Sequence, residues 1–263
     1  MTTTQKEPAA VRRRRLIALI SMLTLILFGF AFIAVREARE SAYQTMCRGR
    51  LGKLQLALIN YHEAFGSLPP AYIADADGKP MHSWRVLILP FLDARGEYAS
   101  YRFDEPWDSP HNRTIADSPV KEHFRCPNRL WNPDAPTTDY VVVMGEGTAF
   151  PGAAPIKLAD IKDGLPETIL VTEINNSRIH WMEPRDLDFR SMSFEVNDRQ
   201  RPSVSGPHLE GPGVVFGDRL TAYRLRKTLK PETLRGLLTI AGREPLDRGS
   251  LIVGASTAYQ IGD

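Results

Sequence analysis

The chain has 263 residues, of which 43% are hydrophobic and 24% are charged, and its formal net charge is +2. This length fits one anchored domain of about two hundred residues. Five of the 33 basic residues and one of the 31 acidic residues lie in residues 1–35, so residues 36–263 carry 28 basic and 30 acidic residues. Such a balance excludes the basic surface typical of nucleic-acid-binding domains, and we expect no nucleic-acid partner.

The N-terminal region combines a basic run with a long apolar segment. Arg12, Arg13, Arg14 and Arg15 precede twenty residues without a charge, which begin at Leu16 and end at Val35. As a helix, twenty residues extend about 30 Å, which matches the hydrocarbon core of a bilayer. The positive-inside rule places the arginine run in the cytoplasm.

These features predict a single-pass protein of the cytoplasmic membrane with its N-terminus inside. Residues 1–15 form a cytoplasmic basic tail, residues 16–35 a transmembrane helix, and residues 36–263 a periplasmic or extracellular domain. A cleaved signal peptide is the main alternative, but it has a shorter apolar core and a small-residue cleavage site, which residues 31–34 do not offer. A buried core helix is a further alternative, and such a helix seldom lies beside an arginine run.

The helix is expected to continue beyond the membrane. Residues 36–65 contain no proline, and apolar residues recur there at steps of four and three: Cys47, Leu51, Leu54, Leu58, Tyr61 and Phe65. This spacing predicts an amphipathic helix over residues 36–65, capped by Gly66 and ended by Pro69 and Pro70. One long helix and two helices with a break near Arg36 both fit the pattern.

The remainder of the chain favours strands. A turn is expected over residues 75–80, a short helix capped by Ser83 over residues 84–93, and loops over residues 94–137 and 145–155. Strands are predicted over residues 138–144, 168–174, 178–183, 191–196, 213–216 and 220–225, and a last helix over residues 231–241. This order predicts an α+β fold, with a long N-terminal helix packed on a mostly antiparallel sheet.

The chain has two cysteines, Cys47 and Cys126. Outside the cytoplasm, two cysteines that lie far apart in sequence are candidates for a disulfide, which we predict here. Two unpaired small apolar residues are the alternative.

Known catalytic and metal-binding motifs are incomplete. His62-Glu63 begins like a zinc-protease helix, but Gly66 occupies the place of the second ligand. His208 and Glu210 resemble part of a deaminase motif without its cysteines. We expect both histidines to lie at the surface or in turns, and we predict no catalytic residue, cofactor or metal site, and therefore no enzyme.

Two further groups of residues allow binding functions. A calcium site could gather acidic residues, although turn capping explains them as well: Asp104, Glu105, Asp108, Asp160 and Asp163. A sugar-binding surface could use the four tryptophans, although core positions are commoner for this residue type: Trp84, Trp107, Trp131 and Trp181.

Several segments suggest a family. After the arginine run and the apolar helix come Cys47, Leu-Gln-Leu-Ala-Leu-Ile-Asn-Tyr-His at residues 54–62, and Gly-Ser-Leu-Pro-Pro at residues 66–70. Further segments follow at residues 83–90, 104–112, 124–127, 138–140, 163–164, 168–173, 181–184, 186–187, 208, 213–218 and 233–242. Over nearly the whole chain this order resembles pilin-like proteins of planctomycete type that carry the domain of unknown function 1559. The resemblance implies a pseudopilin-like ectodomain and supplies no catalytic residues.

The sequence departs from that family at its processing site. Members usually have a glycine at the cleavage point and a glutamate five residues later, whereas this chain has Arg15 and Ile20. We therefore expect the helix to be retained and the protein to act as an anchored structural or interaction protein. Its expected partners are the bilayer and envelope or pseudopilus proteins. The alternative is a binding module for an extracellular ligand such as a polysaccharide.

Overall fold

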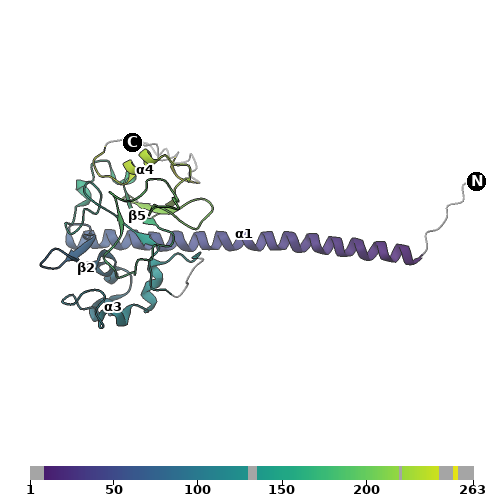
Figure 1. Ribbon diagram of the computed structural model, residues 1–263, viewed down its shortest axis with the longest axis horizontal. Helices are drawn as coiled ribbons and strands as arrows, with labels where there is room; N and C mark the ends of the chain where they lie inside the picture. The colour runs from purple at the N-terminus through teal and green to yellow at the C-terminus, as the bar shows by residue number, and fades with distance from the viewer. Residues whose placement is uncertain (1–8, 130–134, 219–220, 243–250, 254–263) are drawn as a thin grey trace, which may run out of the picture. The chain divides into compact units, whose positions relative to one another are not determined.

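The computed structural model describes residues 9–129, 135–218, 221–242 and 251–253. The chain divides into two compact units, residues 1–43 and residues 44–263. One helix, α1 (Ala9–Phe65), contributes to both (Figure 1). It continues without interruption past Arg36, Gly49 and Gly52, so the single-helix alternative is confirmed.

Within the first unit, α1 is apolar on all sides over residues 16–35. Its large side chains are exposed, for example Leu25 at 72% and Phe28 at 75%. Among the described residues, this is the one helix long and apolar enough to cross a membrane. Its length and composition suit a membrane anchor or a signal sequence.

Within the second unit, α1 contributes one face to the core. Cys47, Leu51, Leu54 and Leu58 are fully buried, as the spacing predicts, whereas Phe65 at the end of the stripe is 64% exposed. The helix ends at Gly66, which has φ +77° and donates its N–H to the carbonyl of His62 at 2.7 Å. A glycine adopts this left-handed conformation without steric cost, which makes it a favourable helix end.

The main sheet has four antiparallel strands in the order β3-β5-β7-β8. These strands are β3 (Tyr140–Val141), β5 (Ile169–Glu173), β7 (Gly213–Phe216) and β8 (Ala222–Arg224). A second, two-stranded antiparallel sheet pairs β1 (Tyr72–Ala74) with β2 (Pro80–Ser83), and β4 (Val143–Met144) pairs in parallel with β6 (Leu187–Asp188). The α+β fold with mostly antiparallel strands is therefore confirmed.

Both faces of the main sheet are covered. Leu170 and Val215 belong to the same core as the buried stripe of α1, whereas Val214 and Phe216 belong to a second core with α4 (Pro231–Leu237). The central strands β5 and β7 are therefore buried along their full length, and Figure 1 shows β5 between α1 and α4. A side chain on β5 that points toward α1 enters a closed interior.

Short helices complete the domain. Ser83 caps α2 (Trp84–Leu87) by accepting the N–H of Arg85 at 3.2 Å, as predicted. The predicted helix over residues 84–93 is shorter than expected, because Pro90 has no N–H to continue it and η1 (Leu89–Phe91) follows. The segment that was expected to be a loop contains α3 (Arg95–Ser100), η2 (Asn112–Ile115) and η3 (Pro119–Phe124), and the chain later forms η4 (Leu158–Asp160) and η5 (Leu165–Glu167).

Several predicted elements differ from the structure. The strand over residues 138–144 is divided into β3 and β4, because the N–H of Val142 donates to the Asp186 carboxylate at 3.0 Å. The predicted strands at residues 178–183 and 191–196 are wrong: these described residues form turns and isolated bridges, and Arg178 and Asn197 have left-handed backbone conformations. The last helix ends early, because Ile240 donates its N–H to Gly147 at 3.0 Å.

Candidate functional site

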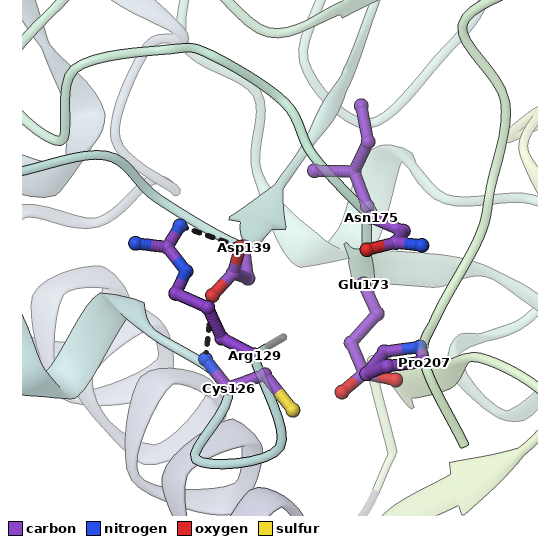
Figure 2. Close-up of a pocket in the computed structure, with 7 residues that line it drawn as sticks. Cys126, Arg129, Asp139, Glu173, Asn175 and Pro207 are labelled. Atoms are coloured by element: carbon purple, nitrogen blue, oxygen red, sulfur yellow. Dashed lines mark hydrogen bonds and ion pairs between the residues drawn. The ribbon is translucent and has the colours of Figure 1, made fainter. Parts of the chain in front are cut away.

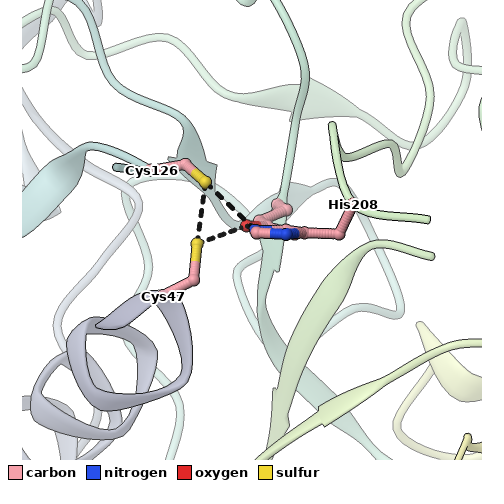
Figure 3. A group of neighbouring side chains, drawn as sticks. Cys47, Cys126 and His208 are labelled. Atoms are coloured by element: carbon pink, nitrogen blue, oxygen red, sulfur yellow. Dashed lines mark hydrogen bonds and ion pairs between the residues drawn. The ribbon is translucent and has the colours of Figure 1, made fainter. Parts of the chain in front are cut away.

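Four buried side chains from distant parts of the chain converge beside α1. Cys47 comes from α1, Cys126 from the segment after η3, Glu173 from the end of β5, and His208 from the loop before β7. Their ligand atoms all lie within 4.8 Å of one another. We refer to these four residues as the Cys–Glu–His cluster, and Figure 3 shows both thiols directed toward each other and toward His208.

The contacts within the cluster are short. The two sulfur atoms are 2.8 Å apart, and the Cys47 thiol also donates to Glu173 Oε1 at 2.8 Å. His208 Nε2 lies 3.3 Å from Cys126 Sγ and 3.7 Å from Glu173 Oε1. All four residues are at most 3% exposed, so the groups interact in a dry environment.

The predicted disulfide is not formed in this structure. Cys47 and Cys126 are free thiols, and their sulfur separation of 2.8 Å exceeds the roughly 2.05 Å of a disulfide bond. The sequence nevertheless identified the two residues that meet. Cys47 Sγ also lies 3.0 Å from the Tyr140 hydroxyl.

One oxygen of the Glu173 carboxylate is hydrogen-bonded to groups outside the cluster. Its Oε2 accepts from Arg224 Nη1 at 2.7 Å and from the N–H of Gly213 at 2.6 Å, which leaves Oε1 directed at Cys47. A Cβ atom at Gly206 would lie 2.6 Å from Oε2, and one at Gly213 would lie 3.3 Å from it. Both glycines therefore provide the space that the carboxylate occupies.

The backbone of Cys126 is positioned by an ion pair between Asp139 and Arg129. Its N–H donates to Asp139 Oδ2 at 2.8 Å, and Asp139 Oδ1 accepts from Arg129 Nη2 at 2.8 Å. Figure 2 shows this arrangement at a small cavity, of about 10 Å³, between Cys126 and Glu173. A cavity of this volume has room for roughly one water molecule or ion.

The close packing changes the acidity of the cluster. Burial raises the pKa of Glu173 to about 8, and the neighbouring Cys47 acts in the same direction. The hydrogen bond with Cys47, together with burial, raises the pKa of the Cys126 thiol. Burial also raises the pKa of Cys47, but its hydrogen bonds with Cys126 and His208 outweigh burial and lower the pKa overall.

Sequence reasoning missed half of this cluster. Glu173 lies within the strand predicted over residues 168–174, and the sequence assigns it no further role. The expectation of a surface position for His208 is wrong because it is 1% exposed. The alternative of a turn agrees with the structure, since the His208 carbonyl accepts the N–H of Gly211 at 3.3 Å. The available signal was the single ionisable residue at the end of the strand over residues 169–173, whose other members are apolar except for Thr172. A carboxylate in such a strand must be paired when both faces of the sheet are covered.

The other candidates have structural roles. Glu105 pairs with Arg102 at 2.8 Å, Asp160 accepts the N–H of Lys157 at 2.9 Å, and Asp163 accepts the N–H of Gly242 at 2.8 Å. These contacts agree with turn capping rather than with a calcium site. His62 Nε2 accepts the N–H of Leu158 at 3.3 Å.

The tryptophans do not form a common platform in the described part of the chain. Trp84 and Trp181 are fully buried, and Trp107 packs against His180 with ring centroids 5.1 Å apart. Trp131 and Leu220, the first residue of a predicted strand, lie outside the described residues.

Comparison with known proteins finds one family model that matches part of the chain. Residues 36–152 match the family model described as "Protein of unknown function (DUF1559)". The match supports the resemblance to the domain of unknown function 1559 over this part of the chain, which includes Cys47 and Cys126. No curated protein and no solved structure matches the chain.

Proposed function

We propose that this protein is anchored in the cytoplasmic membrane by α1 and that its C-terminal domain serves outside the cytoplasm as a structural or interaction module. The observation that carries the proposal is the exposed apolar surface of residues 16–35 beside the arginine run. Burying a leucine, isoleucine or phenylalanine side chain contributes about 1.5–3 kcal/mol, so this surface favours a lipid environment strongly.

The continuity of α1 supports an anchor over a cleaved signal. A signal peptidase cut after the apolar segment would fall inside a helix that continues to Phe65. The stripe from Cys47 to Leu58 on the same helix forms part of the domain core. The N-terminal helix and the folded domain therefore share one continuous element.

The resemblance to pseudopilins supports an interaction role. The resemblance implies an architecture in which a helix leaves the membrane and packs on an antiparallel sheet. The family match covers that helix from residue 36 onward. We propose envelope or pseudopilus proteins as partners and no catalytic activity. The Cys–Glu–His cluster is at most 3% exposed and therefore offers no surface to a substrate.

A polysaccharide-binding module has less support. Two hollows of about 430 and 340 Å³ lie along residues 45–63 of α1, and their linings contain no aromatic side chain. Sugar rings bind preferentially to exposed aromatic faces, and both Trp84 and Trp181 are fully buried.

A disulfide between Cys47 and Cys126 would be compatible with the same extracytoplasmic placement, because oxidising compartments favour such bonds. It is the alternative to the metal site that we propose below. A metal ion that used the same two sulfur atoms as ligands would exclude it.

Protease protection tests the proposed topology. In spheroplasts that express the full chain with an N-terminal tag, external protease is expected to digest the domain and to leave the tag intact. Permeabilised spheroplasts, in which the tag must also be digested, provide the control. A domain that resists protease until the membrane is opened contradicts the proposal.

A further inference from the structure

We propose that the chain binds one structural zinc ion through four side chains: Cys47, Cys126, Glu173 and His208. The proposal rests on the convergence of four potential ligands that are distant in sequence and buried together. It is independent of the membrane topology, since the cluster lies wholly within the unit of residues 44–263.

The donor set is one that zinc prefers. Zn²⁺ binds thiolate sulfur, imidazole nitrogen and carboxylate oxygen in tetrahedral sites, with bonds of about 2.0–2.3 Å. Four protein ligands with no open position are typical of structural sites. Calcium and magnesium require six or more oxygen ligands, and the cluster offers a single carboxylate.

The spacing of the donors comes near to that of a tetrahedral ion, and two contacts would have to lengthen. Bonds of about 2.0–2.3 Å place neighbouring ligand atoms roughly 3.3–3.8 Å apart. His208 Nε2 lies 3.3 Å from Cys126 Sγ and 3.7 Å from Glu173 Oε1, within this range. The two sulfur atoms are 2.8 Å apart, and Cys47 Sγ lies 2.8 Å from Glu173 Oε1. Both contacts would have to lengthen by about 0.7–1 Å to admit the ion.

Surrounding residues already orient the ligands. Arg224 and the Gly213 N–H hold Oε2 of Glu173, so that Oε1 faces the centre of the cluster. Asp139 holds the backbone of Cys126, and the Tyr140 hydroxyl lies 3.0 Å from Cys47 Sγ. Such outer contacts fix ligand geometry in metal sites, and here they are in place before an ion binds.

The buried charge balances when zinc is bound. Zinc binding forms two Zn–S bonds, one Zn–N bond and one Zn–O bond, and the protons held by the two thiols and by Glu173 are released to solvent. The charge of the ion is then cancelled by two thiolates. The Glu173 carboxylate is then balanced by Arg224, which pairs with it at 2.7 Å. A neutral buried site avoids the large cost of an uncompensated charge in the interior.

Zinc also accounts for more of the cluster than a disulfide does. A disulfide uses the two sulfur atoms and gives no reason for the buried Glu173 and His208 beside them. A zinc ion uses all four groups and joins α1 to β5 and to the two loops. Binding free energy at such a site contributes to folding, because the unfolded chain lacks the preformed arrangement.

The test uses the full chain, extracted from membranes in mild detergent without chelator or reductant. Elemental analysis is expected to find about one zinc per chain, as for a closed four-ligand site. Thiol counting after denaturation with a chelator should find both cysteines reduced. The variants Cys126→Ser and His208→Ala are expected to lose most of the zinc, whereas His82→Gln, at another buried histidine, should retain it.

Cobalt substitution tests the site without any variant. Replacing zinc by Co²⁺ in the unmodified protein should give the visible bands of a tetrahedral ion together with thiolate-to-cobalt charge transfer. Three results would overturn the proposal: a disulfide between Cys47 and Cys126 in zinc-free protein, reduced protein that takes up neither ion, or zinc content unaffected by Cys126→Ser.

Discussion

Replacing all four arginines of the run Arg12–Arg15 by asparagine is expected to invert most molecules in the membrane. Residues 1–15 contain five basic residues and residues 36–50 contain four, so the native bias toward a cytoplasmic N-terminus is small. The substitution leaves only Lys6 on the N-terminal side against four basic residues on the other. Because lysine and arginine near the ends of a transmembrane helix set its orientation, the bias should reverse.

The matched control removes charge from the opposite flank. Arg36→Asn with Arg39→Asn should keep the native orientation, because the five basic residues before the helix then face two in residues 36–50. Protease protection with tags at each end measures both variants. An unchanged orientation of the quadruple variant would show that the arginine run does not determine the topology.

Asp186→Ala is expected to destabilise the domain by about 3–5 kcal/mol, the loss typical when one partner of a buried ion pair is removed. Asp186 Oδ1 accepts from Arg85 Nη2 at 2.5 Å, and the two side chains are at most 1% exposed. The carboxylate also accepts from Trp84 Nε1 at 3.2 Å and from the Val142 N–H at 3.0 Å. Burial raises the pKa of Asp186 only to about 6, so the group is ionised at neutral pH.

The control for this variant is an exposed ion pair. Asp117, whose side chain is 80% exposed, contacts Lys121 at 3.1 Å. Asp117→Ala should change stability by about 0–1 kcal/mol, as is usual for surface pairs. Urea unfolding of the full chain in mild detergent, followed by circular dichroism, compares the two. Equal losses for both variants would show that the buried pair does not stabilise the domain.

Elements with a strong local pattern were predictable from the sequence. The regular spacing from Cys47 to Leu58 defined the buried face of α1, and Gly66 defined its end. The hairpin of β7 and β8 followed from apolar segments around a turn. By contrast, β1, β2 and β6 are two to four residues long, and their pairing depends on contacts that no local pattern encodes.

The candidate site was only partly predictable, for a related reason. The two cysteines stand out by composition, so their proximity could be predicted from the compartment. Glu173 and His208 reach them through the register of the sheet, in which Tyr140 pairs with Glu173, and through the loop before β7. Such placement is a property of the tertiary fold, which sequence spacing does not show.

Retention of the N-terminal helix is the central claim of this account, and the intact mass of the native protein tests it most directly. Arg15 and Ile20 stand where the resemblance to pilin-like proteins predicts a glycine and a glutamate for processing, and α1 continues from the apolar segment into the domain. Protein extracted from membranes is therefore expected to have a mass that includes the arginine run. Loss of residues 1–15 with methylation at Leu16, or loss of the whole apolar segment, would contradict the account.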